Sequence, residues 1–265
     1  MSGYHAEKMC EGFWRIRDSR QDCCYLIEGG ERAAVIDTCM SDEPLLPMLE
    51  TLTDKPIDLI LTHAHIDHMY RAEEFRKVYV HEREKACYTK GSARLTRFGS
   101  MAFRVNIKKY PVHSYACIAE GEEFDLGNVT LKCIGAFGHT PGSMILVDEA
   151  HKAVICGDAV GSGSGVWMFL PDCTSVADYA DSLDKTVKAL EPYRDFTYYG
   201  GHYGQSSGEY SYPLSYGMFD DMRALCRGIL GGEIASIPIK KLPLNFLLYY
   251  RYKTAAILTR RSKLK

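Results

Sequence analysis

The sequence predicts an α+β fold in which two mixed β-sheets pack face to face with helices on the outside. Apolar runs joined by turn residues indicate β-hairpins in both halves of the chain, at 24–37 and at 144–156. Apolar residues at helical spacing indicate helices between and after these hairpins, most clearly at 175–190. Hairpins that alternate with helices, twice over, favour a four-layer αβ/βα sandwich.

The composition is typical of a globular protein with one large domain or two small ones. Of 265 residues, 46% are apolar and 25% are charged, and the net charge of −2 argues against broad nucleic-acid binding, which needs a basic surface. The polar N-terminal segment gives no signal peptide, and charges interrupt each apolar stretch before the roughly 18 residues of a membrane span. Ten cysteines without a Cys-x-x-Cys pair indicate reduced core thiols. We therefore expect a cytoplasmic protein without a nucleic-acid partner or a membrane span; the sequence gives no oligomeric state.

The first half of the chain is predicted to hold short strands joined by tight turns. Gly29-Gly30 separates the two apolar runs of the first hairpin. Pro47 loosens the first turn of the helix that follows, because proline lacks a backbone N–H donor. In chain order we expect an edge strand near 13–16, strands at 24–28 and 32–37, a helix at 45–52, a buried strand at 57–61, a strand at 78–80 and a short helix at 82–88.

The second half is predicted to repeat the hairpin pattern and to end in an extension. Thr174 or Ser175 can cap the helix at 175–190. We expect residues 1–204 to form the core of the fold, and residues 205–265 to form a helical and strand extension that packs on the same domain. The expected elements are strands at 124–126, 129–134, 144–147, 153–156, 196–199 and near 255–258, with an amphipathic helix over 218–229.

Four potential metal ligands occur in six consecutive residues, between a strand and a helical segment. Such a strand-to-helix turn lies at a sheet edge, where α/β folds usually place their chemistry. Imidazoles and carboxylates at this density repel one another or stay unsatisfied without a cation, so a polar loop without a metal is the weaker interpretation. The four residues are His63, His65, Asp67 and His68.

Three further candidate ligands lie in glycine-rich turns. His139 follows Gly138, Asp158 follows Cys156-Gly157, and His202 follows Gly200-Gly201. Glycine lets the backbone bend sharply and approach closely at such positions. A single histidine in a turn is more often a surface residue than a ligand, but their occurrence after the first cluster favours a shared metal site.

With these motifs the chain resembles the metallo-β-lactamase superfamily of hydrolases, in its glyoxalase II and lactonase-like branch. The resemblance covers roughly residues 20–204 and includes 62–68, 138–143, Gly157-Asp158 and Gly201-His202. It implies that His63, His65 and His139 hold one metal ion. It also implies that Asp67, His68 and His202 hold a second and that Asp158 bridges the two. One departure is Cys39, where the family usually has glycine after Asp-Thr.

The resemblance implies two Zn²⁺ ions, although the same ligands can hold iron or manganese. A hydroxide held between the metals would attack the substrate, so no serine or cysteine nucleophile is required. Asp67 is a candidate proton shuttle, with a purely ligating role as the alternative. Asp37 is either a hydrogen-bond acceptor for a ligand imidazole or the cap of a turn. A core thiol is the favoured interpretation of Cys156.

Three stretches could shape the substrate pocket. Trp167 and Phe169 follow a Gly/Ser run and form either a hydrophobic wall beside the metals or part of the core. Residues 91–119 carry basic and aromatic side chains, including Arg97 and Arg104, and contain no Asp or Glu. As a lid this basic insert would favour an anionic, partly apolar small molecule; as a solvated surface it would not. Tyr203 is a candidate donor to an oxyanion, with a packing role as the alternative.

The predicted activity is metal-dependent hydrolysis of a small ester, lactone or thioester. Phosphodiester or β-lactam hydrolysis is the alternative within the same chemistry. An iron-containing redox enzyme of the same fold is the alternative from another class. A non-catalytic binding protein is disfavoured because all seven ligand positions are filled.

Overall fold

The computed structural model describes residues 3–91, 115–161, 165–204, 214–239 and 247–265. Its contacts divide the chain into two compact units. The first unit consists of 1–133 and 146–151, and the second consists of 134–145 and 152–265. The expected core boundary at residue 204 falls inside the second unit and stays a prediction.

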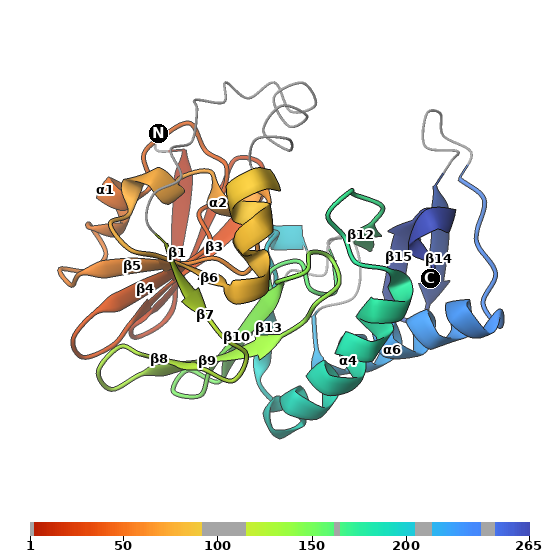
Figure 1. Cartoon of the computed structure of the whole chain (residues 1–265). Helices are drawn as coiled ribbons and strands as arrows, with labels where there is room; N and C mark the ends of the chain where they lie inside the picture. Colours follow the sequence, from red (N-terminus) through yellow and green to blue (C-terminus); the bar gives the residue numbers. More distant parts are fainter. Residues whose placement is uncertain (1–2, 92–114, 162–164, 205–213, 240–246) are drawn as a thin grey trace. The chain divides into compact units, whose positions relative to one another are not determined.

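The first unit is built on a seven-stranded mixed sheet (Figure 1). The first four strands pair antiparallel, and the next three add in parallel. The expected edge strand at 13–16 is instead an inner strand, because a polar strand near the N-terminus pairs outside it. In sheet order the strands are β1 (Tyr4–Cys10), β2 (Phe13–Asp18), β3 (Cys23–Glu28), β4 (Ala33–Ile36), β5 (Ile57–Ile60), β6 (Val78–His81) and β7 (Tyr115–Ile118).

The helices of the first unit are shorter than predicted. The expected helix at 45–52 is reduced to α1 (Leu46–Leu49). The amides of Leu45 and Leu46 at its start donate to the Glu74 carboxylate rather than to a cap residue. The metal-ligand turn leads into α2 (Ile66–Met69) and η1 (Ala72–Glu74). The expected helix at 82–88 is two short pieces, η2 (Glu82–Glu84) and the π-helix η3 (Cys87–Gly91).

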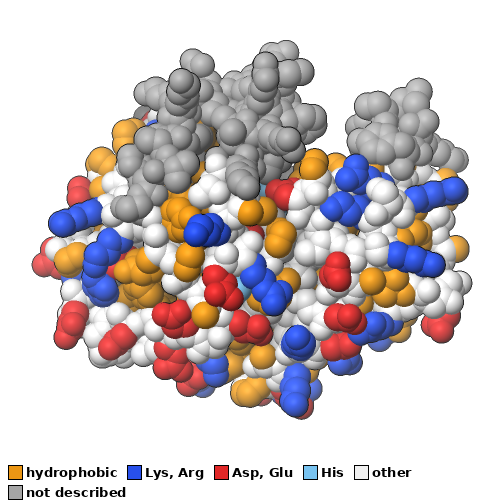
Figure 2. All heavy atoms as spheres, viewed as in Figure 1, with side chains coloured by type: hydrophobic (Ala, Val, Ile, Leu, Met, Phe, Trp, Pro, Cys, Tyr) orange, Lys and Arg blue, Asp and Glu red, His pale blue; other side chains and the backbone are white. Residues whose placement is uncertain are grey.

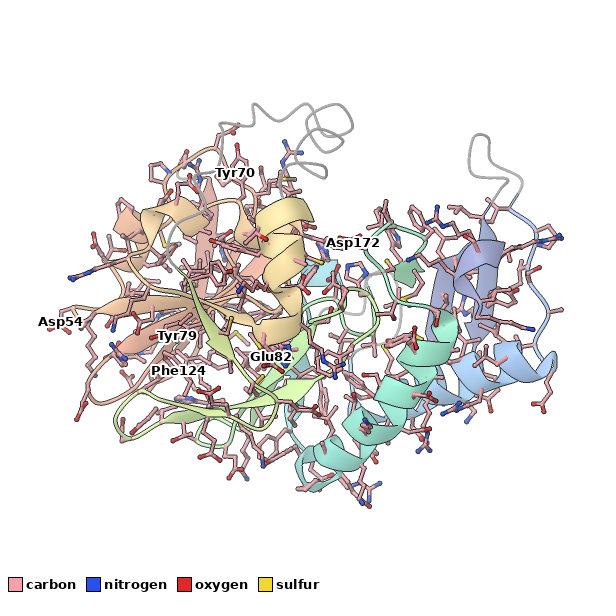
Figure 3. All side chains as sticks on the ribbon, viewed as in Figure 1. Asp54, Tyr70, Tyr79, Glu82, Phe124 and Asp172 are labelled. Carbon is pink, nitrogen blue, oxygen red and sulfur yellow. The ribbon has the colours of Figure 1, made fainter. Side chains whose placement is uncertain are left out.

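A second, five-stranded sheet has the order β13-β11-β10-β9-β8. Its five strands are those predicted at 124–126, 129–134, 144–147, 153–156 and 196–199. The division between the units passes through two of its strands. Within the first unit, Tyr79 on β6 meets Phe124 on β8 edge to face, with ring centroids 4.7 Å apart (Figure 3). The strands are β8 (Glu123–Asp125), β9 (Thr130–Gly135), β10 (Met144–Asp148), β11 (Ala153–Ile155) and β13 (Thr197–Tyr199).

Two amphipathic helices of the second unit pack on each other, and both were predicted. Ser175 and Asp178 form a reciprocal capping box at the start of α4 (Val176–Leu190), which continues into η4 (Glu191–Tyr193). The second helix, α6 (Tyr216–Gly231), ends at Gly232, whose φ of 77° suits glycine.

A third sheet in the second unit was not predicted. Its order is β12-β15-β14, and α6 packs against β14 and β15 (Figure 1). The segment expected as a Gly/Ser loop with a hydrophobic wall forms a strand at 166–168, which pairs in parallel with the predicted strand near 255–258. Three-residue strands leave no periodicity to detect. The strands are β12 (Val166–Met168), β14 (Leu248–Tyr252) and β15 (Ala255–Thr259), followed by η6 (Arg261–Lys263).

The surface carries charges of both signs. Figure 2 shows Lys and Arg side chains interspersed with Asp and Glu over the visible face of the described residues, as expected for a net charge of −2. In the part of the chain that the structure describes, no helix combines the length and the apolar character needed to cross a membrane.

Candidate metal centre

The first half of the candidate site lies at the carboxyl ends of two parallel strands, β4 and β5. Ile36 and Ile60 pair at the end of the register, and the amide of Asp37 donates to the Ile60 carbonyl at 3.0 Å. The chain then turns through Thr62 and enters α2 at Ile66. This parallel pairing brings Asp37 and the turn at 62–68 to one sheet edge, where the sequence predicted that turn to lie.

The three histidines of this turn form a buried cluster. The rings of His63 and His65 have centroids 4.7 Å apart, and those of His63 and His68 are 4.0 Å apart. All three are at most 7% exposed. The ligand atoms of Asp67 and His68 lie within 4.8 Å of one another, while the Asp67 side chain stays 26% exposed. The structure therefore brings together the four residues predicted from this stretch.

Asp37 holds this cluster in place. Its Oδ2 lies 2.8 Å from Nδ1 of His68 and accepts the Thr62 hydroxyl at 2.7 Å, while its Oδ1 accepts the Thr62 amide at 2.8 Å. Its φ of 63° is in the left-handed region, which Asp tolerates better than most residues. Of the two roles considered for Asp37, the structure supports the acceptor role, since a carboxylate at Nδ1 leaves Nε2 as the metal-binding nitrogen.

Glu84 and Cys39 have contacts in the first unit that the sequence did not reveal. Glu84 is fully buried, and its Oε1 accepts the Ala64 amide at 2.8 Å, inside the His-x-His segment. Only the tertiary fold brings η2 beside this turn, so no local pattern identified it. Cys39, the departure from the family pattern, has a φ of 59°, a conformation in which glycine is unstrained. Its buried Sγ lies 3.2 Å from the Asp22 carbonyl.

The second half of the candidate site lies at the carboxyl ends of β11 and β13. These strands are parallel, with Ile155 beside Tyr199, so Asp158 and His202 each come three residues past the paired ends. The backbone bond from Gly201 to Gly157 continues the pairing into both turns. Nε2 of His202 consequently lies 3.4 Å from Oδ2 of Asp158.

His139 completes this half. Its Nδ1 lies 2.9 Å from the Trp167 carbonyl, and its Nε2 lies 3.8 Å from Oδ2 of Asp158. Gly138 permits the close approach of α4 here, because a Cβ at this position would lie 2.0 Å from the Tyr179 ring. The Trp167 carbonyl thus fixes the ring that the sequence identified as a ligand, a role that the tryptophan side chain gave no reason to expect.

The donor set fits a divalent metal ion. Imidazole and carboxylate are ligands of zinc, and equally of iron or manganese. In His68 and His139 an oxygen acceptor at Nδ1 favours the neutral tautomer with an available lone pair on Nε2. The two halves therefore contain groups that can bind metal.

The other candidate residues vary in position. Trp167 is 37% exposed, with its ring centroid 5.4 Å from that of Phe169, which excludes a core role for Trp167. Tyr203 is half-buried. Arg97 and Arg104, with nearly all of the basic insert, lie outside the described residues. Burial raises the pKa of the Cys156 thiol, which agrees with its role as a core residue.

The fold and these motifs define a family. The model of the metallo-β-lactamase superfamily matches residues 20–202, and the chain belongs to that superfamily. It is a metallo-hydrolase with the α+β fold expected from the sequence.

Relatives and solved structures agree with this assignment. The chain is 25% identical over 214 residues to the acyl-coenzyme A thioesterase MBLAC2 of Gallus gallus, covering 76% of each chain. It is 25% identical over 150 residues to the hydroxyacylglutathione hydrolase GloC of Haemophilus influenzae, covering 54% of this chain and 68% of the relative. A metallo-β-lactamase from Erythrobacter litoralis shares the fold with a TM-score of 0.59 and 16% identity, covering 86% of this chain and 97% of that one. A superfamily protein from Sulfolobus tokodaii does so with a TM-score of 0.56 and 18% identity, covering 91% of each.

Proposed function

We propose that this protein is a dinuclear zinc hydrolase that cleaves acyl thioesters. The observation that carries the hydrolase chemistry is the matched pair of oxygen acceptors at Nδ1 of His68 and of His139, which prepares one imidazole in each half for metal. The thioester preference rests on similarity to an acyl-coenzyme A thioesterase along three quarters of both chains and to a hydroxyacylglutathione hydrolase.

The proposed ligand sets follow the family pattern at seven positions. We assign His63, His65 and His139 to one ion, Asp67, His68 and His202 to the other, and Asp158 to both. Two bound metal ions would act as Lewis acids and lower the pKa of water at the site to near neutrality.

The chain's own groups would orient the ligands and handle a proton. Asp37 carries a negative charge that stabilises the imidazole of His68 with its proton on Nδ1. Asp67 is the carboxylate of the turn at 62–68 and its side chain is 26% exposed, so it can pass a proton to the thiolate leaving group. In the alternative it serves as a ligand alone.

Esters and lactones are the nearest competing substrates, because their acyl carbonyl demands the same chemistry. A phosphodiester is attacked at phosphorus rather than at a carbonyl carbon. A β-lactam is attacked at a carbonyl carbon, but its leaving group is the nitrogen of a strained amide. The iron redox alternative uses the same ligands, and the metal content separates it from hydrolysis.

The test is a substrate panel run with metal-loaded protein. Purified protein is analysed for zinc, iron and manganese, then assayed on acyl thioesters, esters, lactones, β-lactams and a phosphodiester. We expect about two zinc ions per chain and the highest kcat/KM on thioesters. Stoichiometric iron with thiol-dependent oxygen uptake, or a clear preference for another class, would refute the proposal. The variant Asp158→Asn should lose metal and activity. Its control is Asp195→Asn, which changes an exposed carboxylate of the second unit.

A further inference from the structure

The three-stranded sheet of the second unit has one buried face and one partly exposed face. Tyr250 and Ile257 pair on the buried face, the side on which β14 and β15 pack with α6. Successive side chains of a strand alternate between faces. The residues between the buried ones are accordingly half-buried or exposed, and they belong to the other face.

Four apolar side chains form a continuous row across this second face. Trp167 on β12 pairs with Leu258 on β15, and Leu258 pairs with Tyr249 on β14. Tyr249 in turn pairs with Ile237 through an isolated bridge, and the Ile237 amide donates to the Tyr249 carbonyl at 2.7 Å. Paired residues in neighbouring strands place their side chains on the same face. We call Trp167, Leu258, Tyr249 and Ile237 the apolar row.

The two ends of the apolar row are exposed: Trp167 is 37% exposed and Ile237 is 47% exposed. Among the described residues, Leu230 is the other large apolar side chain with a similar exposure, at 37%. Three interstrand spacings make the row about 14 Å long. An extended alkyl chain of about ten methylene groups has this length.

One end of the row adjoins a metal-ligand residue. The carbonyl of Trp167 lies 2.9 Å from Nδ1 of His139, so the tryptophan ring is within one side-chain length of that imidazole. The other residues of the row follow at increasing distance along the sheet. A molecule whose reacting group is held at His139 could therefore lay an apolar tail along the row.

The three strands place one charged side chain, that of Arg251, on this face. The three strands contain no Asp or Glu, and Arg251 pairs with Ala256, which places its side chain on the same face as the row. The strands therefore place no carboxylate beside an apolar chain that lies on the row.

We propose that the apolar row binds the acyl chain of the thioester substrate, with the reacting carbonyl at the Trp167 end. This inference rests on the thioesterase function proposed above. A row one residue wide is narrow for a protein partner, since a stable interface buries about 800 Å² on each side. An acyl chain needs only the row, and each methylene group placed on it leaves water.

The first test is the dependence of kcat/KM on acyl length. Thioesters of coenzyme A with 4 to 16 carbons are compared in wild type, Trp167→Ser, Ile237→Ser and the control Leu230→Ser, whose side chain is on α6. For wild type we expect kcat/KM to rise about two-fold with each added methylene and to level off near 12 carbons. A two-fold rise corresponds to about half of the free energy gained when a methylene group is fully buried. Ile237→Ser should end the rise at a shorter chain, Trp167→Ser should flatten it throughout, and Leu230→Ser should keep the wild-type profile.

The second test measures binding without turnover. The chain has two tryptophans, so Trp14→Phe leaves Trp167 as the single fluorophore. Titration with the S-dodecyl thioether of coenzyme A should shift the Trp167 emission to shorter wavelength, and the S-ethyl thioether should do so far less. This reading decides the inference even if no thioester is hydrolysed, a result that would refute the proposed function alone.

Several results would overturn the inference. One is a flat chain-length profile in an active thioesterase, and another is a rising profile that both row variants leave unchanged. A third is an unshifted emission with the dodecyl ligand. A fourth is a dimer in sedimentation experiments that Ile237→Ser dissociates, because the row would then be an interface between two copies.

Discussion

Nδ1 of His68 lies 2.8 Å from Oδ2 of Asp37, and both side chains are almost completely buried. This pair joins the turn after β4 to the helix after β5, although the two residues are far apart in the sequence. The carboxylate selects the histidine tautomer and thereby prepares Nε2 to bind metal.

Asp37→Asn should lower the affinity for metal about 10- to 100-fold. The Asn amide oxygen can still accept the Thr62 amide, but its NH₂ group would then face Nδ1 of His68. The proton of His68 would move to Nε2 and block the metal-binding lone pair. Asn also tolerates the positive φ, so backbone strain does not confuse the result. The measurement is zinc affinity by competition with a chromophoric chelator.

The control for this change is Asp54→Asn, which removes an exposed carboxylate of the same unit. It should leave zinc affinity unchanged. Equal zinc affinity in Asp37→Asn and wild type would contradict the tautomer argument.

Asp158→Asn should reduce the metal content and abolish hydrolysis while the sheets still form. The Asp158 carboxylate lies close to both His139 and His202, and its charge balances the cations proposed there. Metal analysis, activity and far-ultraviolet circular dichroism are measured together, with Asp195→Asn as the control. A variant that kept two metals and full activity would refute the bridging assignment.

Gly138→Ala should destabilise the protein by about 1–3 kcal/mol, because the added Cβ would meet the buried Tyr179 ring. The shift should also displace His139, so zinc affinity should fall as well. Gly217→Ala is the matched control, since the nearest atom to its Cβ is the Ser215 hydroxyl at 3.7 Å. Gly217 is the second residue of α6, so this control should change the stability by less than about 0.5 kcal/mol. Urea unfolding of both variants decides the matter, and equal midpoints would contradict the packing argument.

His81 should make the folded state less stable as the pH falls below about 6.5. Burial lowers the pKa of its imidazole, so the unfolded chain binds a proton that the folded chain resists. The contribution of His81 to the free energy of unfolding is complete above the pKa of the unfolded chain. It is lost as the pH falls to the lowered pKa of the folded chain. His81→Asn removes the titration, and its amide oxygen can still accept the Arg83 amide.

The measurement is urea unfolding between pH 8 and pH 5. A chelator is present, so that every sample is free of metal and metal release does not contribute to the pH dependence. The stability of His81→Asn should depend less on pH than that of wild type. His5→Asn, at an exposed histidine, should match wild type. A slope in His81→Asn as steep as in wild type would assign the acid sensitivity to other groups.

Much of the site could be predicted because metal chemistry leaves a local pattern. Four ligands in one turn are visible without any tertiary information, and glycine-flanked turns marked His139, Asp158 and His202. The hairpins and a cap of α4 at Thr174 or Ser175 were predicted for the same reason, since alternation and capping depend on nearby residues. The acceptor for the first amides of α1 was not predicted, because Glu74 lies outside that segment and meets it only in the folded chain.

The sequence by itself determined the kinds of ligand, their order along the chain, and most strands and long helices. Only the tertiary structure decided which oxygen atoms hold the ligand rings, that Glu84 supports the first turn, and that β12 joins β15 in a third sheet. The physical reason is range. Helical and strand periodicity and turn preferences act over a few residues, whereas pairing register and side-chain exposure depend on segments that meet only after folding. The apolar row belongs to this second kind, because its four residues come from strand segments that are separate in the sequence and share a face only once the sheet has formed.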